Sequence, residues 1–518
     1  MANDTVTSNQ ATTQITNVIS GDYRIDVLLE SANFRWNYPQ PLKTPVTVTY
    51  SFMTAAPTYA EADDKKGFTP FNDAQKTATK DILAQISAQF DVTFKEVADS
   101  AGSYGQIRFG NNDQGETSAG YASYPDPSGN PAGGDLYINN QDPANLEGIT
   151  PGTNAYATLV HEIGHTLGLK HPGNYNAGEA ASTDPGNFLA KDEDSEANTI
   201  MSYVKTPQQL ERDFFGKYDI LALDYLYGAR SFKTGGDIYS FGNSAGVLLQ
   251  IINDDGGIDT IDASTATVAA TIDLRDSGSS SVGQLSDGAA AQNNLTIAFG
   301  DIIENAIGSA LGDTITGNSS ANSITGGAGN DTLDGGDGID SAVFQGTKSA
   351  YTISPQGTGW TIADGTSGRD GTDALAKIER LKFSDFSVAL DVGATSNAGI
   401  AAKILGAVFG KSEVANKQYA GIGLKYLDSG TSYADLMKLA LDVKLGAGFS
   451  TSSEVTLLYT NLVSATPSAA DIAYWEGTVT SNQFTQTTLA IMAADHALNT
   501  NNIQLAGLAA TGLEYIPA

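Results

Sequence analysis

Three histidines stand within eleven positions of one short stretch. The chain has 518 residues and only four histidines in all. His161, His165 and His171 fall in the segment TLVHEIGHTLGLKHPG, whereas His496 lies far along the chain. Imidazole nitrogens are common zinc ligands in proteins. The order H-E-x-x-H-x-x-G-x-x-H therefore indicates a metal site built from this one segment.

The first two histidines need a helix to position them. Thr153 or Asn154 can cap its start, and apolar side chains recur every fourth position over 155–167. On such a helix His161 and His165 lie one turn apart, on the face roughly opposite the apolar stripe. Both rings can then reach a single zinc ion.

The third histidine needs a reversal of the chain. If the helix continued, His171 would lie about 9 Å beyond His165 along the axis. Gly168 allows the turn because glycine accepts positive φ, and Pro172 disfavours a helix after the third ligand. Three protein ligands leave a coordination position for water, which is typical of catalytic zinc. Glu162 can then act on that water as general base.

This motif resembles that of the metzincin metalloproteases and, within them, that of the serralysins. The family carries a methionine turn downstream, which Met201 in TIMSYV supplies, and a tyrosine two positions later, which is Tyr203 here. The resemblance covers about residues 20–345. It implies that Met201 forms an apolar floor beneath the zinc. It also implies that the Tyr203 hydroxyl stabilises the oxyanion and serves as an additional zinc ligand.

Four consecutive nine-residue units begin at position 308, and they read GSALGDTIT, GNSSANSIT, GGAGNDTLD and GGDGIDSAV. Their eighth residues are all apolar: Ile315, Ile324, Leu333 and Ala342. Such a period winds a parallel β-roll, in which the apolar residue points inward and aspartates of stacked turns hold calcium. The sequence therefore predicts a β-roll with several structural calcium ions.

The sixth position of each unit supplies the candidate side-chain ligands: Asp313, Asn322, Asp331 and Asp340. Only the last two units satisfy G-G-x-G-x-D, so Asp331 and Asp340 are the stronger candidates and Asp313 and Asn322 the weaker. Backbone carbonyls in the two glycine-rich turns would complete the shells, at Gly326, Ala328, Gly335 and Asp337. The stretch DDGGIDTID adds an isolated candidate site through Asp259.

These repeats resemble those of calcium-binding proteins that Gram-negative bacteria export by type I secretion. That resemblance implies a secreted, extracellular protein, with the type I secretion machinery as a partner and no cleaved signal peptide. The N-terminal segment MANDTVTSNQATTQ accordingly has neither a basic patch nor an apolar run. The chain has no cysteine, which excludes disulfides, and its net charge of −31 argues against nucleic acid as a partner. No stretch is long and apolar enough for a transmembrane segment.

Helical and strand patterns alternate in the first part of the chain. A helix is expected over 72–90, capped by Asn72 or Asp73, and another over 212–229 with Gly228 as its stop. Strands are expected near 46–52, 92–97, 106–110, 119–125 and 133–139. A substrate peptide would extend along an edge strand, for which the last two of these segments are the candidates.

The composition changes twice along the chain, so we expect a multidomain α+β protein. A leader or propeptide would occupy residues 1–19 and a metzincin catalytic domain 20–235. A β-roll domain with calcium-binding repeats would follow over 236–396, and a small all-α module over 397–518. The last part resembles a helical module found at the ends of secreted bacterial repeat proteins. It could bind a cell-surface component, carry the export signal, or serve a structural role alone.

These features favour a secreted zinc endopeptidase that hydrolyses peptide bonds of extracellular proteins, with one catalytic zinc and several structural calcium ions. The alternative is a calcium-dependent cell-surface or adhesion protein whose protease domain processes only itself or one surface partner. The complete histidine motif favours the enzyme, and the C-terminal helices keep the alternative open. Broad digestion and dedicated processing of one surface protein remain equally compatible with the sequence.

Overall fold

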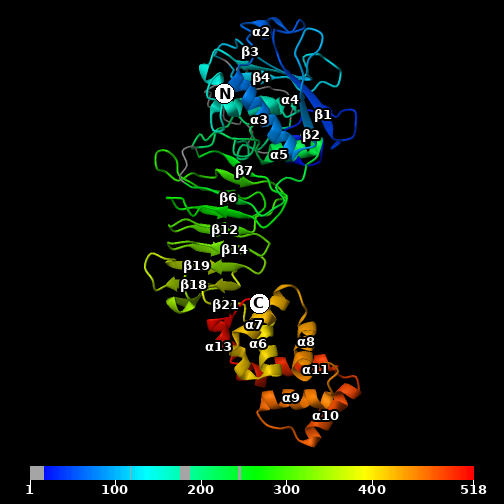
Figure 1. Cartoon of the computed structure of the whole chain (residues 1–518), viewed down its shortest axis with the longest axis vertical. Coiled ribbons are helices and arrows are strands. Elements are labelled where there is room, and N and C mark those ends of the chain that lie inside the picture. Colours follow the sequence, from blue (N-terminus) through cyan, green and yellow to red (C-terminus); the bar gives the residue numbers. More distant parts are fainter. Residues whose placement is uncertain (1–16, 117, 176–186, 243–246) are drawn as a thin grey trace. The chain divides into compact units, whose positions relative to one another are not determined.

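The computed structural model describes the whole chain except residues 1–16, 117, 176–186 and 243–246 (Figure 1). The chain divides into two compact units. The first contains the residues up to 259 together with 275–303, and the second contains 260–274 and 304–518. Residues 1–16 of the expected leader lie outside the described part. The predicted division into four parts remains a prediction.

A five-stranded sheet organises the first unit. Its strands are β1 (Val46–Phe52), β2 (Val92–Glu96), β3 (Ile107–Asn112), β4 (Gly120–Ala122) and β5 (Asp135–Asn139). They confirm the five predicted strands. The order is β2-β1-β3-β5-β4, and all neighbouring pairs are parallel except β4 with β5. The sheet therefore ends in a short antiparallel edge strand, β4.

The helices of the first unit are α1 (Tyr23–Asp26), α2 (Ala62–Lys65), α3 (Asp73–Gln89), η1 (Pro143–Asn145), α4 (Asn154–Thr166) and α5 (Lys217–Tyr227). The prediction of α3 is confirmed, and Asn72 caps it by accepting a hydrogen bond from the N–H of Gln75. Apolar residues of α3, α4, α5 and the sheet form one core cluster, which includes Ile82, Ile163 and Leu223. The apolar face of α4, opposite its histidines, therefore packs into this core and holds the helix in place.

The predicted start of the last of these helices is wrong, because α5 begins at Lys217 and not at 212. The buried guanidinium of Arg212 donates to the carbonyl oxygens of Phe214 and Phe215 and to those of an earlier loop. These bonds hold the segment out of a helix. Gly216 then caps the start of α5, and Gly228, with φ of 88°, ends the helix at the predicted place.

The first unit also contains β6 (Ile238–Ser240) and a small sheet of β7 (Gln250–Ile252), β10 (Ser279–Ser280) and β11 (Leu295–Ile297). In that sheet β11 is central, antiparallel to β10 and parallel to β7.

Short strands of the second unit stack into two rows. One row has the order β21-β20-β16-β14-β12-β8 and comprises Ser387–Ala389, Arg380–Lys382, Ser341–Val343, Ser323–Thr325, Asn305–Ile307 and Thr260–Asp262. The other has the order β17-β18-β19-β15-β13-β9 and comprises Tyr351–Gln356, Gly359–Asp364, Thr372–Ala376, Thr332–Asp334, Thr314–Thr316 and Thr271–Asp273. A 3-10 turn, η2 (Lys348–Ala350), precedes β17.

The nine-residue units determine how these rows are paired. Strands two units apart lie side by side and parallel, with Thr314 opposite Thr332 and Ser323 opposite Ser341. Successive units therefore contribute their strands to the two rows in turn, as in a β-roll. The eighth residues of all four units are buried, at 0 to 1% exposure. They lie on the inner side of the strands, as the period predicts.

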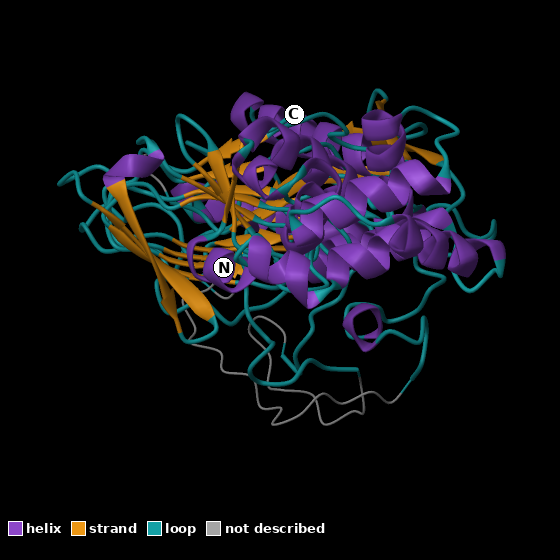
Figure 2. Cartoon of the chain, turned by 90° about the horizontal axis from the view of Figure 1, so that it is seen from below, coloured by secondary structure: helices purple, strands orange, loops and turns teal. Residues whose placement is uncertain are grey.

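The rest of the second unit is mainly helical, and Figure 2 distinguishes its helices from the strands by colour. The helices are α6 (Asn397–Ile404), η3 (Leu405–Phe409), η4 (Lys411–Ala415), α7 (Lys417–Asp428), α8 (Tyr433–Leu445), α9 (Thr451–Val463), α10 (Ala469–Thr480), α11 (Gln486–Asp495), α12 (Ala497–Asn502) and α13 (Leu505–Thr511). Within the described parts of the chain, no helix combines the length and the apolar character that a membrane crossing needs.

One element of this region was not expected of an all-helical module. The strand β22 (Leu513–Tyr515) pairs antiparallel with β21, which extends the first row by one strand. Leu513 and Tyr515 are buried and Glu514 between them is not, so the segment alternates as a strand does. Three residues are too few for periodicity alone to reveal a strand.

Candidate metal centre

Helix α4 carries the first two histidines, and its two ends are fixed by local chemistry. Thr153 caps the start through a hydrogen bond that its hydroxyl oxygen accepts from the N–H of Tyr156. The helix ends at Thr166, and Gly168 follows with φ of 103°. A Cβ at this glycine would lie 2.1 Å from the carbonyl oxygen of Phe34. The reversal therefore requires glycine both for its φ and for space.

The reversal brings the three histidines together. The Nε2 atom of His171 lies 3.1 Å from the Nε2 of His161 and 3.1 Å from the Nε2 of His165. One nitrogen from each ring fits within 4.8 Å of the others, as ligands of one metal ion would. The Nδ1 atoms of His161 and His165 contact the carbonyl oxygens of Ile200 and Leu169, each at 2.7 Å. A proton on each Nδ1 leaves the Nε2 lone pair directed at the metal position.

Burial keeps the rings of α4 neutral, which metal binding requires. His161 and His165 are 2% and 7% exposed. Burial, with the neighbouring histidines, lowers the pKa of His165 to about 3 and holds that of His161 well below its usual range. The donor set, its tautomers and its protonation therefore fit a zinc ion.

Glu162 lies next to the first histidine and is 5% exposed. No described residue supplies a hydrogen-bond partner for its Oε2 atom, and burial raises the pKa of the carboxyl to about 8. The edge strand β4 passes directly against this side chain. A Cβ at Gly120 would lie 3.0 Å from Cγ and 3.1 Å from Oε1 of Glu162. A substrate strand beside β4 would therefore run close to the carboxylate.

The methionine turn lies beneath the histidines. Met201 is fully buried, and a Cβ at Gly164 would lie 2.8 Å from its Sδ, so the sulfur packs against α4 between the two histidine positions. The half-buried ring of Tyr203 lies 4.6 Å from that of His171 and 5.7 Å from that of His161, centroid to centroid. The structure thus brings every residue predicted for the zinc site into one place.

A different arrangement surrounds the carboxylates of the repeats. Asp331 accepts a hydrogen bond from the N–H of Asp313, and the N–H of Asp331 donates to Asp373, at 2.8 and 3.0 Å. The carboxylates thus form a ladder along one row of turns. A second ladder runs from Asn322 to Asp340 and on to Glu379, at 2.8 and 2.9 Å. Asp373 and Glu379 lie outside the nine-residue units, and the sequence did not single them out.

Both strong candidates have one oxygen that no described residue satisfies, Oδ2 of Asp331 and Oδ2 of Asp340. A Cβ at Gly326 would lie 2.1 Å from the first of these atoms, and a Cβ at Gly335 would lie 2.6 Å from the second. Burial raises the pKa of Asp331 to about 6 and that of Asp340 to about 7. These oxygens face the glycine turns, where the sequence expected the carbonyl ligands.

The glycines with positive φ in these turns flank the other two predicted carbonyl positions. Ala328 lies between Gly327 and Gly329, and Asp337 lies between Gly336 and Gly338. The N–H of Asp337 donates to the carbonyl of Asn318. Asp259, predicted as an isolated site, has two acidic neighbours in the first unit. One carboxylate oxygen each of Asp237, Asp254 and Asp259 lies within 4.8 Å of the other two.

Comparison with known proteins finds two metallopeptidase family models that match adjacent parts of the chain. Residues 217–399 match the family model described as "Peptidase M10 serralysin C terminal", and residues 3–214 match the model of metallo-peptidase family M12. Over these two segments the chain resembles the serralysin-like metzincins. It is 36% identical to metallopeptidase AprA of Pseudomonas marginalis over 302 residues, which cover 53% of this chain and 61% of that protein.

Two serralysins give similar alignments. The serralysin of Proteus mirabilis is 33% identical over 315 residues, covering 55% of this chain and 62% of that protein. Serralysin G of Dickeya chrysanthemi is 34% identical over 315 residues, covering 56% of this chain and 62% of that protein. The chain thus spans about three fifths of the length of the curated relatives that it matches.

Asp219 is a residue of this site that the sequence analysis missed. It is fully buried at the start of α5, and its Oδ2 accepts the N–H of Ile200 and the N–H of Gly216, each at 2.7 Å. Since the carbonyl of Ile200 contacts Nδ1 of His161, Asp219 holds the residue whose carbonyl orients the first histidine. Burial raises its pKa to about 6. The sequence feature that could have revealed Asp219 is an acidic residue three positions after a glycine at the start of an apolar helix, as in a capping box.

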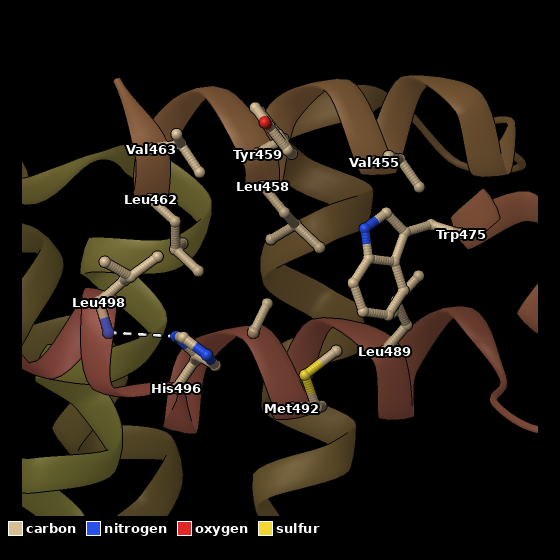
Figure 3. A pocket seen from close by; sticks show the side chains of 11 residues that line it. Val455, Leu458, Tyr459, Leu462, Val463, Trp475, Leu489, Met492, His496 and Leu498 are labelled. Carbon is tan, nitrogen blue, oxygen red and sulfur yellow. Dashed lines mark hydrogen bonds between the residues drawn. The ribbon is translucent and has the colours of Figure 1, made fainter. Parts of the chain in front are cut away.

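The fourth histidine takes no part in either arrangement. The Nδ1 of His496 accepts the N–H of Leu498 at 3.1 Å and so caps α12. Its ring lines one end of an apolar pocket of about 260 Å³, and Trp475 lies towards the other end (Figure 3). Among the described residues, His496 belongs to no group of side chains that could hold a metal ion.

Proposed function

We propose that the chain is a zinc-dependent endopeptidase with one catalytic zinc ion, held by His161, His165 and His171. The observation that carries this proposal is the convergence of three Nε2 atoms beside a buried glutamate. The family assignment supports it, since both matching family models describe metallopeptidases. Met201 would close the floor of the site, and Gly168 would bring in the third ligand.

The zinc ion that these residues would hold supplies Lewis-acid activation of water and of the scissile carbonyl. Glu162 accepts the proton that the attacking water loses and returns it to the leaving amine nitrogen as the C–N bond breaks. A cation at the three rings would keep this carboxyl ionised, because a nearby opposite charge lowers its pKa. Tyr203 donates a hydrogen bond to the developing oxyanion, and its ring position beside His171 allows it also to approach the metal as a ligand.

Protein or peptide substrates would bind extended along β4. This strand is one of the two edge strands of the sheet, and edge strands hold peptides by main-chain hydrogen bonds. Gly120 brings the strand against Glu162, so a bound peptide would present its scissile bond to the carboxylate.

The repeats would bind several structural calcium ions. Asp331 and Asp340 would supply the main side-chain ligands, with Asp313 in a weaker position. The backbone carbonyls at Gly326, Ala328, Gly335 and Asp337 would complete the shells. The unsatisfied oxygens that face Gly326 and Gly335 support this assignment. Asp259, together with Asp237 and Asp254, would form a further site.

We also propose that the protein is secreted to the extracellular medium by type I export from a Gram-negative bacterium, as the calcium repeats of the sequence suggest. Residues 1–19 would be the leader or propeptide, 20–235 the catalytic domain, 236–396 the β-roll and 397–518 the helical module. The helical module would contact a cell-surface component. The comparisons do not favour the alternative of an adhesion protein that processes only itself or one partner.

The test is proteolysis by the purified chain and by Glu162→Gln, with bound zinc measured by elemental analysis. We expect the wild type to cleave casein and to carry one zinc. The variant should lose activity by about 10³-fold while keeping its zinc. Glu147→Gln, at an exposed position of the same unit, is the control and should keep full activity. Undiminished activity in Glu162→Gln would contradict the mechanism.

A further inference from the structure

Tyr175 follows the third histidine by four residues and joins the aromatic group around it. Its ring lies 6.0 Å from that of His171 and stacks on that of Tyr203 at 5.1 Å, with 24° between the ring planes. Tyr203 in turn lies 4.6 Å from His171. The three rings therefore contact one another, and one face of the Tyr203 ring packs on Tyr175.

The hydroxyl of Tyr175 links two segments through a buried carboxylate. It donates to Oδ1 of Asp194 at 2.8 Å and accepts the N–H of Tyr203 at 3.2 Å. The same Asp194 oxygen accepts the hydroxyl of Ser202 at 2.7 Å, and the Ser202 oxygen accepts the N–H of Val204. Tyr175, Asp194 and Ser202 are 9%, 1% and 0% exposed. The backbone on both sides of Tyr203 is thus held by one buried network.

We propose that Tyr175 is a positioning residue that orients Tyr203 for its part in the reaction. Its ring supports the ring of Tyr203, and its hydroxyl fixes the peptide N–H of the same residue. Asp194 anchors that hydroxyl from the other side. Loss of the Tyr175 hydroxyl would leave the N–H of Tyr203 without this acceptor and Asp194 with one donor fewer, so the segment would relax. The proposal rests on the proposed function, in which Tyr203 stabilises the oxyanion.

The central test is Tyr175→Phe, which keeps the ring and removes the hydroxyl. A fluorogenic peptide that the wild type cleaves serves as the substrate. We expect kcat to fall roughly tenfold, with KM within about twofold of the wild type, because the effect is confined to the transition state. Bound zinc should remain at one ion per chain.

A double-mutant cycle separates positioning from a general loss of structure. In the background of Tyr203→Phe, adding Tyr175→Phe should cause little further loss of kcat, because the group that Tyr175 positions has already been removed. An equal fold-loss in both backgrounds would overturn the proposal. So would a wild-type kcat for Tyr175→Phe alone.

Tyr227→Phe is the matched control. It likewise removes a buried tyrosine hydroxyl. The Tyr227 hydroxyl donates to the carbonyl of Leu167 and accepts the backbone N–H of Trp36. It should lower the melting temperature by a similar amount and leave kcat unchanged. An equal loss of kcat in this control would show that any lost buried hydroxyl has the same effect, and would overturn the proposal.

Asp194→Asn tests the same network from the other partner if Tyr175→Phe does not fold. It weakens the acceptor of the Tyr175 hydroxyl. It should lower kcat by a smaller factor than Tyr175→Phe does, and it should do so only in chains that keep Tyr203. An unchanged kcat in a folded Asp194→Asn chain would count against the proposal. Failure of the proposed function gives a different result, because the wild-type chain itself would then cleave no peptide.

Discussion

The histidine site of the first unit and the carboxylate ladders of the second use burial in opposite ways. Burial keeps His161 and His165 neutral, and each has its second ring nitrogen on a carbonyl oxygen. Burial of Asp331 and Asp340 instead raises their pKa values and leaves one oxygen of each without a described partner. The first site would keep its geometry without an ion, whereas the ionised carboxylates of the second would be stabilised by a cation.

This difference predicts separate roles for zinc and calcium. A neutral, preorganised donor set can lose its ion without losing its fold, so zinc would supply chemistry and little of the folding free energy. Buried carboxylates without counter-ions destabilise the folded state, because desolvation penalises their charge. Calcium would therefore supply folding free energy to the repeats and no chemistry. Each prediction below separates these two roles.

The largest expected effect is on the repeats. Asp331→Asn removes a charged ligand and should remove most of the stabilisation that calcium gives through that site. At a calcium concentration of 100 Kd, that stabilisation is about 2.7 kcal/mol. Chemical denaturation of the second unit, with and without calcium, measures it. Asp337→Asn is the control, because it changes an exposed side chain in the next glycine turn and keeps the backbone carbonyl there. Equal calcium stabilisation in wild type and Asp331→Asn would remove Asp331 from the site.

The next effect is on zinc affinity. Asp219→Asn keeps one acceptor but loses the Oδ2 atom that holds the N–H of Ile200, so His161 would lose its orientation. Loss of such a supporting group typically lowers metal affinity 10- to 100-fold. Competition with a chelator of known affinity measures the change.

The control for this change is Asp224→Asn in the same helix. That residue pairs with Lys43 and should leave zinc affinity unchanged. Wild-type zinc affinity in both variants would contradict the role of Asp219 in orienting His161.

A further effect concerns the pH dependence of the unfolding free energy. The folded-state pKa values of Asp331 and Asp340 lie above 3.8, so the folded chain binds protons more tightly than the unfolded chain at these sites. Without calcium, the unfolding free energy of the second unit should therefore fall as pH rises from about 4 to about 7. With calcium this fall should disappear, because calcium stabilises the ionised form. A calcium-free chain that gains stability over this range would contradict the account.

The sequence predicted those features that depend on neighbours along the chain. Helix α4, its cap at Thr153 and the reversal at Gly168 follow from spacing and residue type. The inward positions of the repeats follow from their period. Asp219 was missed because its partner Ile200 lies nineteen residues earlier. Asp373 and Glu379 were missed because the hairpin of β17 and β18 interrupts the repeat before them.

The start of α5 shows a different limit. The apolar pattern continues to residue 212, but the side chain of Arg212 takes the carbonyls that a helix would need. Periodicity records which residues are apolar and not where a long side chain will place its hydrogen bonds. The terminal strand β22 depends likewise on a partner more than a hundred residues away, in β21.

Hydrogen exchange of the metal-free chain tests the central contrast most directly. Zinc and calcium are added back separately, and protection is read by mass spectrometry at α4 and at the repeat strands β13 to β16. We predict that calcium alone protects the repeat strands and that α4 is protected with or without zinc. Peptide cleavage should require zinc. Repeat strands that are fully protected without calcium, or an α4 that is protected only with zinc, would contradict the account.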